Sequence, residues 1–275
     1  QIKEELDALI FGNIFHDTME ILYRQFMNVQ KTAIVESRHF FWLKERVNEA
    51  FNEAFQKHFQ IKRDSKKVMI EGRNIIAAEI IKKMIYKILN IDKKYAPFKI
   101  IGLEAGTKEG FSIDVALEVN GRNHVIGLKG KIDRIDLKAG VLRVIDYKTG
   151  KDEKTFETLD SLIDRENIKR NKTAFQIFFY SYLVQNRYKE SYERIEPSIF
   201  NSKQLFDDKF DWRLVQKEKG ESEVKIQSFG KYRNGFEKIL KKLLEEIWNT
   251  ENSFDQTPDL KKCEFCPYNG ICKRF

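Results

Sequence analysis

The sequence predicts an α/β or α+β fold, in which helices come first and antiparallel strands and then alternating helices and strands follow. Three observations support this prediction. Apolar residues recur at helical spacing over the first ninety residues, they alternate with polar residues beyond Pro97, and both periods occur after residue 170. We therefore expect one domain with a mixed sheet, flanked by helices and preceded by an N-terminal helical elaboration.

The first ninety residues show the helical period in three stretches. The chain has only four prolines, at positions 97, 197, 258 and 267, so none interrupts these stretches. The second and third stretches fall within residues 36–95, which we expect to form a helical insertion. The periodic residues are Ile10, Phe11, Ile14, Phe15, Ile21, Leu22 and Phe26, then Phe40, Leu43, Val47, Ala50, Phe51, Ala54 and Phe55, and then Ile76, Ile80, Met84, Ile88 and Ile91.

The region after Pro97 predicts consecutive antiparallel strands, because its apolar residues alternate and turn residues separate the runs. The expected strands cover residues 99–105, 112–119, 124–137 and 141–147, with turns at Gly110, Asn120-Gly121 and Ala139-Gly140. The remaining patterns predict a helix over residues 173–187, strands near 194–200 and 223–227, and a long helix over 231–248.

Composition and charge exclude several classes of protein. With 22 Phe, 10 Tyr and 3 Trp the chain can bury a core, so it is not a disordered protein. No run approaches the roughly 18 apolar residues of a membrane span, and no signal-peptide pattern opens the chain, so we expect a cytoplasmic protein. The 50 Lys+Arg against 42 Asp+Glu give a net charge of +8, which permits an anionic partner without naming one. Because a helical pattern follows Gln1 almost at once, we expect a fragment of a longer protein.

The last hairpin of the strand region carries the functional prediction. If residues 139–140 are a two-residue turn, residues whose numbers sum to 279 face each other across the strands. Asp133 then lies opposite Asp146, at the end of an otherwise apolar face. On the other face Asp136 meets Arg143, a favourable charged pair. The apolar pairs between the acids and the turn are Ile135 with Val144 and Leu137 with Leu142.

Two directly opposed carboxylates destabilise a sheet, so the pairing of Asp133 with Asp146 needs a physical reason. Either one acid holds a proton or a cation lies between them. Oxygen ligands of this kind select Mg²⁺, Mn²⁺ or Ca²⁺, and Lys148 shares a face with Asp146 because side chains alternate along a strand. A divalent cation beside an ammonium group is what phosphodiester hydrolysis requires. The alternative is that both acids are solvated ends of an exposed hairpin.

Four short motifs resemble those of the PD-(D/E)xK nuclease superfamily, and specifically its RecB-like branch with AddB-type exonuclease domains. They follow the family's order between residues 12 and 180 and so span most of the chain. The motifs are Gly12-Asn-Ile-Phe-His16, Gly130-Lys-Ile-Asp133-Arg-Ile-Asp136, Val144-Ile-Asp146-Tyr-Lys148-Thr-Gly150 and Gln176-Ile-Phe-Phe-Tyr180. The resemblance implies a restriction-endonuclease-like α/β core and a nuclease that uses one or two Mg²⁺ or Mn²⁺ ions.

The resemblance also implies roles for individual residues. His16, Asp133 and Asp146 would ligate the metal, together with the backbone carbonyl of Tyr147. Asp133, Asp146 and Lys148 would be the catalytic residues.

We expect Gln176 and Tyr180, which are i,i+4 neighbours on one helix face, to support the site or contact DNA. The alternative is that this helix simply packs on the sheet. Glu104, in the strand before the hairpin, is a further candidate acid near the metal, although a lone acid in a strand is usually at the surface.

Two expectations concern the neighbours of these residues. Gly12 lacks a Cβ, which lets a phosphate or another backbone approach beside His16. Arg134 points to the face opposite Asp133 in the predicted register, so we do not place it at the metal.

The chain has three cysteines, all within a tail formed by residues 258–275. Cys263, Cys266 and Cys272 have a C-x2-C-x5-C spacing, which in a cytoplasmic protein suggests a metal more than a disulfide. The RecB-like resemblance implies a [4Fe–4S] cluster whose fourth cysteine precedes the first motif. Since such clusters take four ligands, we expect an intact cluster only in the parent protein. Zinc with a borrowed His, an incomplete cluster and free thiols in a disordered tail stay open, and we favour the last.

The expected partner is DNA, met by basic side chains near the metal and with little sequence specificity because no base-reading motif occurs. A helicase domain or subunit is a second expected partner, since the resemblance suggests a helicase-linked exonuclease of DNA repair or recombination. The alternatives are a CRISPR-associated RecB-like nuclease, a catalytically silent DNA-binding module of the same fold, and a zinc-binding interaction protein built on the tail. The basic residues near the proposed site are Lys129, Lys131, Lys148, Lys151, Arg165, Lys169, Arg170 and Lys172.

Overall fold

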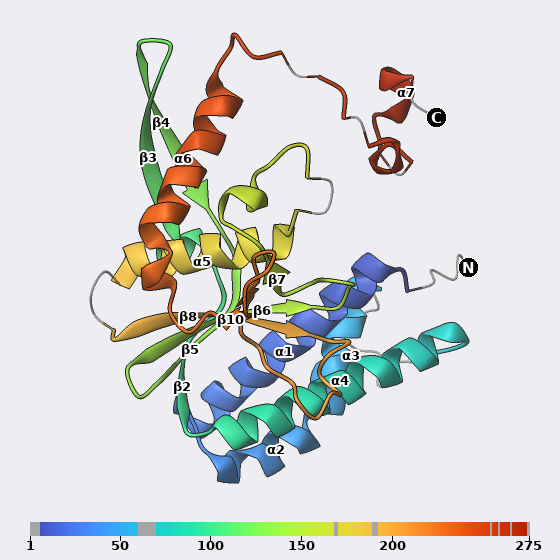
Figure 1. The fold of residues 1–275 in the computed structure, drawn as a ribbon. Helices are drawn as coiled ribbons and strands as arrows, with labels where there is room; N and C mark the ends of the chain where they lie inside the picture. The colour runs from blue at the N-terminus through green and yellow to red at the C-terminus, as the bar shows by residue number, and fades with distance from the viewer. Residues whose placement is uncertain are drawn as a thin grey trace.

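The computed structural model describes residues 6–59, 70–167, 170–188, 192–253, 255–257, 259–264 and 266–273. Its centre is a five-stranded sheet in the order β1-β2-β5-β6-β8 (Figure 1). β6 and β8 run parallel and the other neighbours antiparallel, so the sheet is mixed, as predicted. Its strands are β1 (Ile34–Val35), β2 (Phe98–Ala105), β5 (Ile132–Lys138), β6 (Val141–Lys148) and β8 (Arg194–Asn201). The strands outside it are β3 (Ser112–Val119), β4 (Arg122–Lys129), β7 (Thr155–Phe156), β9 (Val215–Gln216) and β10 (Val224–Lys225).

The single strand predicted over residues 124–137 was wrong, because this stretch forms the end of β4 and most of β5. In the described chain β3 and β4 pair only with each other, whereas β5 pairs with β2. The break falls at Gly130, where a Cβ would lie 2.8 Å from Leu183 and 2.9 Å from Tyr180 of a covering helix. The β3–β4 ribbon is therefore inserted between β2 and β5, and the antiparallel strands are not all consecutive neighbours.

Helices cover both faces of the sheet (Figure 1). The helices α1 to α4 pack on one face and α5 and α6 on the other, each layer closing its own apolar core. The first helix begins after Asp7, whose carboxylate accepts a hydrogen bond from the Ile10 backbone N–H at 2.7 Å. The helices predicted from the apolar period are confirmed, although residues 60–69 of the expected insertion lie outside the described ones. The helices are α1 (Ala8–Gln30), α2 (Phe40–Glu45), α3 (Val47–His58), α4 (Arg73–Tyr95), α5 (Lys172–Tyr188), α6 (Arg233–Trp248) and α7 (Asn269–Cys272).

The strands after α5 are confirmed in part. β8 occupies the stretch predicted near residues 194–200, and only two residues of the stretch predicted near 223–227 form β10. β10 joins β9 and β7 in a separate three-stranded sheet. β7 and β9 have two residues each, too few for an alternating pattern to reveal them.

The β5–β6 hairpin has the predicted register. Ile135 lies opposite Val144, and Asp136 lies opposite Arg143. The turn residues at positions 139 and 140 have φ angles of 47° and 77°, as a two-residue turn with both residues in the left-handed region requires.

Four charged side chains form a fully buried network beneath this hairpin, which we call the buried arginine network: Asp92 of α4, Arg134, Asp136 and Arg143, each 0% exposed. Arg134 donates to both oxygens of Asp92, at 2.6 and 2.8 Å, and to Asp136 at 2.9 Å. Arg143 donates to Asp136 at 2.8 Å. Two positive and two negative charges offset each other, which allows ions to be buried. The network ties α4 to the sheet, and Arg134 points into the helical layer, as the register predicts.

Candidate metal centre

The predicted site residues come together at one end of the central sheet. β5 runs antiparallel to both β2 and β6, so its first residues lie beside their last ones. Glu104 near the end of β2, Asp133 near the start of β5 and Asp146 near the end of β6 therefore come from three adjacent strands. His16 of α1 reaches the same place. We call these four side chains the metal centre.

His16, Asp133 and Glu104 lie close enough together to hold a metal ion, and this closely spaced group does not include Asp146. His16 Nδ1 lies 3.3 Å from Asp133 Oδ2 and 3.9 Å from Glu104 Oε1. One donor atom from each of the three lies within 4.8 Å of the others. A ring nitrogen with two carboxylates suits a divalent ion such as Mn²⁺ or Mg²⁺. The side chains are recessed, with 27% of His16 and 10% of each acid exposed.

Asp146 is the most deeply buried acid of the centre, with only 2% of its surface exposed. Its Oδ2 accepts no aligned hydrogen bond in the described chain, although Lys148 Nζ lies 2.8 Å away. Burial, and after it the negative charge of Asp133, raise the pKa of Asp146 to about 7. A buried carboxylate beside a second acid is a place that fits a divalent cation.

Asp133 and Asp146 are not paired across the β5–β6 hairpin in the way that the sequence predicted. The described pairing ends one rung earlier, at Arg134 and Ile145. Asp133 Oδ2 instead accepts a hydrogen bond from the backbone N–H of Tyr147 at 2.7 Å. A side-chain hydrogen bond thus holds Asp133 against the end of β6. The carbonyl of Tyr147 as a metal ligand stays a prediction.

His16 carries a positive charge when no metal is bound. Burial acts to lower the pKa of His16, but hydrogen bonds and charges from Asp133 and Glu104 outweigh burial and raise it to about 10. The imidazolium therefore offsets part of the negative charge of the acids. Since only a neutral ring ligates a metal, an ion bound by His16 displaces this proton.

Lys148 is held from two sides. Its Nζ lies 2.8 Å from Asp146 Oδ2 and donates to Gln176 Oε1 at 2.7 Å. Gln176 Nε2 in turn donates to the hydroxyl of Tyr180 at 2.8 Å. α5 therefore reaches the centre through the lysine. A contact of Gln176 or Tyr180 with DNA stays a prediction.

Glu104 lies close to His16 and Asp133, although a lone acid in a strand is usually at the surface. The pairing of β2 with β5 shifts between Ile100 and Gly102, a bulge that redirects the side chains after it. Glu104 itself has a φ of 48°, a strained value for a residue with a side chain, and such strain concentrates at functional sites. Its carboxylate also pairs with Lys131 at 2.5 Å. Neither the bulge nor the φ leaves a signal in the sequence.

The group that lies close to Gly12 is a side chain, whereas the sequence suggested a phosphate or another backbone segment. A Cβ at this position would lie 3.3 Å from Thr149 Oγ1. The neighbour is thus a side chain that follows β6, where a phosphate or a backbone was expected. The missing Cβ lets α1 lie close to this end of β6, and His16 follows one helical turn later.

Several of the predicted basic residues are engaged within the protein. Lys131 pairs with Glu104, and Arg165 pairs with Glu246 of α6 at 2.7 Å. Arg170 donates to a backbone carbonyl at 3.2 Å. Lys131 and Arg165 are nevertheless exposed, as are Lys129, Lys151 and Lys172, and Lys169 lies outside the described residues.

The three cysteines do not form a ready cluster site. Cys263 follows a short helical turn at Leu260–Lys262, and Cys272 ends α7. Among the described residues the three sulfur atoms do not all lie within 4.8 Å of one another, and each thiol is half-buried and free. With three cysteines in the chain and four ligands needed, these residues do not fit a [4Fe–4S] cluster.

Comparison with known families agrees with this geometry. The model of the PD-(D/E)XK nuclease superfamily matches residues 1–273, and the chain therefore belongs to that superfamily. No curated protein matches the chain. Membership implies metal-dependent nuclease activity on DNA, with divalent ions such as Mg²⁺ as the general cofactors of the family. In the described part of the chain no helix is long and apolar enough to span a membrane.

Proposed function

We propose that this chain is the exonuclease domain of a helicase-linked DNA repair or recombination protein, and that it hydrolyses phosphodiester bonds with Mg²⁺ or Mn²⁺. The observation that carries the proposal is the buried carboxylate of Asp146, whose pKa is raised by burial and by the charge of Asp133 and whose Oδ2 lies 2.8 Å from Lys148 Nζ. A buried acid with a purely structural role would instead lie among cations, as Asp92 does beside Arg134.

The proposed ligands are His16, Asp133, Asp146 and the carbonyl of Tyr147, with Glu104 as an additional acid. A divalent ion held there supplies a Lewis acid that polarises a phosphoryl oxygen and makes a bound water more acidic. The remaining steps belong to the protein. The acids and His16 would hold the ion at the recessed end of the sheet, where 27% of His16 and 10% of Asp133 and Glu104 are exposed.

Lys148 is the proposed catalytic lysine. Its ammonium stabilises the negative charge that develops on the phosphoryl oxygens, or orients the attacking water. Gln176 and Tyr180 keep the ammonium in place through the hydrogen bonds described above. Exposed lysines near the hairpin, such as Lys129 and Lys151, attract the phosphates of the strand without reading its sequence.

The assignment to the RecB-like branch and its AddB-type exonucleases rests on the four motifs and on the helices within residues 36–95, between the first and second motifs. We propose that residues 1–275 act as one nuclease domain in the cytoplasm. Any [4Fe–4S] cluster belongs to the parent protein, with a ligand that this chain does not contain.

Digestion of end-labelled linear and of circular DNA, each single- and double-stranded, tests the proposal. With Mg²⁺ or Mn²⁺ we expect linear DNA to be degraded from its ends and circles to stay intact, and with EDTA we expect neither to change. Lys148→Met should be inactive, whereas Lys242→Met, which removes an exposed lysine of α6, should keep its activity. Cleavage of circular DNA would indicate an endonuclease instead of an exonuclease. If the metal-loaded protein cleaved no DNA, the proposal would be refuted.

A further inference from the structure

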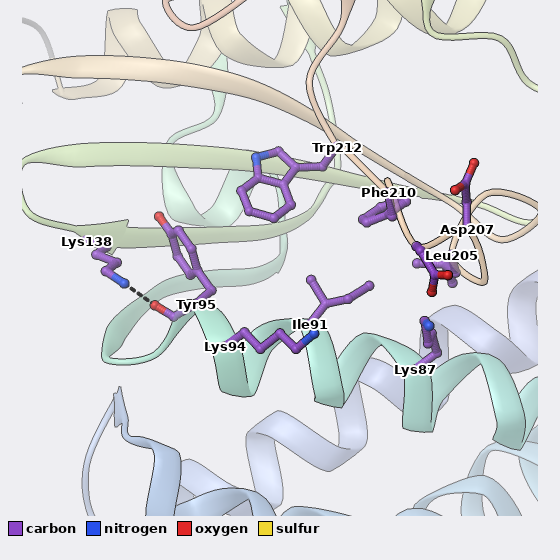
Figure 2. Close-up of a pocket in the computed structure, with 10 residues that line it drawn as sticks. Lys87, Ile91, Lys94, Tyr95, Lys138, Leu205, Asp207, Phe210 and Trp212 are labelled. Carbon is purple, nitrogen blue, oxygen red and sulfur yellow. Dashed lines mark hydrogen bonds between the residues drawn. The ribbon is translucent and has the colours of Figure 1, made fainter.

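A cavity of about 310 Å³ lies on the α4 side of the molecule. Its walls are the C-terminal half of α4 and the segment 205–212 that follows β8 (Figure 2). Lys138, the last residue of β5, also lines it. Asp133 stands five residues earlier in the same strand, which at the rise of a β-strand corresponds to about 17 Å. The cavity is therefore separate from the metal centre.

The lining combines aromatic rings with lysines. Figure 2 shows the rings of Tyr95 and Trp212 next to each other above Ile91 of α4. Lys94 and Lys138 lie at the Tyr95 end of the cavity, and Asp207 lies toward the other end. Aromatic rings that stack on bases, together with cations that meet phosphates, are the combination by which proteins bind single-stranded nucleic acids.

The two rings are fixed in place from behind. Trp212 Nε1 donates to Glu196 at 2.8 Å. The guanidinium carbon of buried Arg143 lies 3.8 Å from the ring centre of Tyr95 and 4.9 Å from that of Trp212. Arg143 Nη1 is buried and has no hydrogen-bond partner in the described chain. Because these contacts hold the rings, the cavity is preformed, which reduces the entropic cost of binding a ligand.

We propose that this cavity binds one nucleotide unit of a single-stranded nucleic acid, outside the catalytic centre. The base stacks on one of the two rings, which stand at 80° to each other with centroids 5.7 Å apart. The phosphate meets Lys94 and Lys138, whose ammonium also donates to the backbone carbonyl of Tyr95. The carboxylate of Asp207 accepts a hydrogen bond from an N–H group on a base edge, such as N3–H of thymine. The choice of a nucleic acid over other aromatic anions rests on the proposed function, whereas binding in the cavity needs no catalysis.

A neighbouring hollow continues the cavity along α4. It shares Lys87, Ile91 and Lys94 with the cavity and adds Lys93 and Ser37. The next phosphate of a strand would thus meet lysines again, whereas a free mononucleotide would not use them. A short strand should therefore bind more tightly than a mononucleotide.

Tryptophan fluorescence of the full chain in EDTA tests the proposal, because a stacked base quenches indole emission. We expect a short oligodeoxythymidylate to quench the protein, Trp212→Phe to abolish the quenching, and Trp248→Phe, at an exposed tryptophan on α6, to retain it. Quenching by thymidine monophosphate as well supports the same site with a free nucleotide as ligand. Quenching by neither, or equal quenching by inorganic polyphosphate, which has no base, overturns the proposal.

Charge reversal provides a second test that does not alter the rings. Lys94→Glu should weaken oligodeoxythymidylate binding about tenfold, whereas Lys242→Glu, at an exposed lysine of α6 on the other face of the sheet, should leave it unchanged. Equal affinity of both variants overturns the proposal. A protein that shows Trp212-dependent quenching but cleaves no DNA would refute the proposed nuclease and leave the cavity site standing. A protein that cleaves DNA but shows no Trp212-dependent quenching would refute the cavity site and leave the proposed nuclease standing.

Discussion

The buried arginine network and the metal centre contain acids from the same hairpin, but their charges are arranged differently. In the network two acids face two arginines, and every carboxylate oxygen accepts a hydrogen bond. In the metal centre three acids face His16, Lys148 and the exposed Lys131, and one oxygen of Asp146 has no aligned donor in the described chain. Both acids of the network are satisfied within the described chain, although Arg143 Nη1 has no hydrogen-bond partner there. In the metal centre, by contrast, two neighbouring acids repel each other, and a cation would relieve this repulsion.

Asp92 and Asp146 show that burial alone does not set the behaviour of an acid. Both are almost completely buried, and burial acts to raise the pKa of each. For Asp92 the charge and hydrogen bonds of Arg134 outweigh burial and lower the pKa below its ordinary value of 3.8. For Asp146 the charge of Asp133 adds to burial and raises the pKa to about 7. The sum of the neighbouring charges therefore separates Asp92, which Arg134 keeps ionised, from Asp146, where the effects of burial and Asp133 outweigh that of Lys148.

Asp146→Asn should produce the largest effect, because it removes a charged ligand without changing the shape of the side chain. We expect the rate of Mg²⁺-dependent DNA cleavage to fall about a thousandfold or more, measured with end-labelled linear DNA. The circular-dichroism spectrum should match that of the unchanged protein. Cleavage at an undiminished rate would remove Asp146 from the catalytic residues.

The same substitution in the network, Asp136→Asn, should act on stability. It leaves buried arginine charge without its counter-ion, and breaking such a pair costs about 3–5 kcal/mol in the free energy of unfolding. Urea unfolding in EDTA measures this loss. Asp146→Asn is the matched control and should be no less stable than the unchanged protein, because it relieves repulsion from Asp133. Equal losses in the two variants would contradict the distinction between the two clusters.

Metal binding should stabilise the centre and leave the network unaffected. At a concentration of Mn²⁺ a hundredfold above its dissociation constant, the free energy of unfolding should rise by about 2.7 kcal/mol, measured by urea unfolding with and without the ion. His16→Ala should reduce this gain, whereas His124→Ala, on the β3–β4 ribbon, should not. If the gain persisted in full without His16, that residue would not be a ligand.

Much of the fold follows from local pattern. The long helices and the β5–β6 hairpin are strongly periodic, and the turn at residues 139–140 fixes the register that pairs Asp136 with Arg143. The β3–β4 ribbon could not be separated from β5 in the same way, because apolar alternation continues through the break. The break at Gly130 depends on the close approach of Tyr180 and Leu183 from α5, a contact between segments about fifty residues apart in the sequence.

The metal centre was predictable where a motif and a register agreed, and unpredictable where backbone geometry decided the outcome. Asp133 and Asp146 come from a hairpin whose pairing can be worked out from its turn. Glu104 joins them because a bulge and a positive φ turn its side chain toward His16. In the network, the pairing of Asp136 with Arg143 could be predicted because the two residues are cross-strand neighbours. The part played by Asp92 could not be predicted, because α4 supplies this residue across the core.

Gln176→Ala should have a smaller effect than the changes described above, because it removes only one of the two contacts that hold Lys148. The ion pair with Asp146 remains, so we expect kcat to fall about tenfold, the magnitude associated with losing one hydrogen bond to a charged group, and KM to stay unchanged. Gln176→Glu keeps an oxygen that accepts from the lysine and should restore much of the rate. Tyr180→Phe, which only loosens Gln176, should cost less than Gln176→Ala. A kcat unaffected by Gln176→Ala would mean that Asp146 alone positions the lysine, and α5 would then serve the sheet as packing rather than the metal centre.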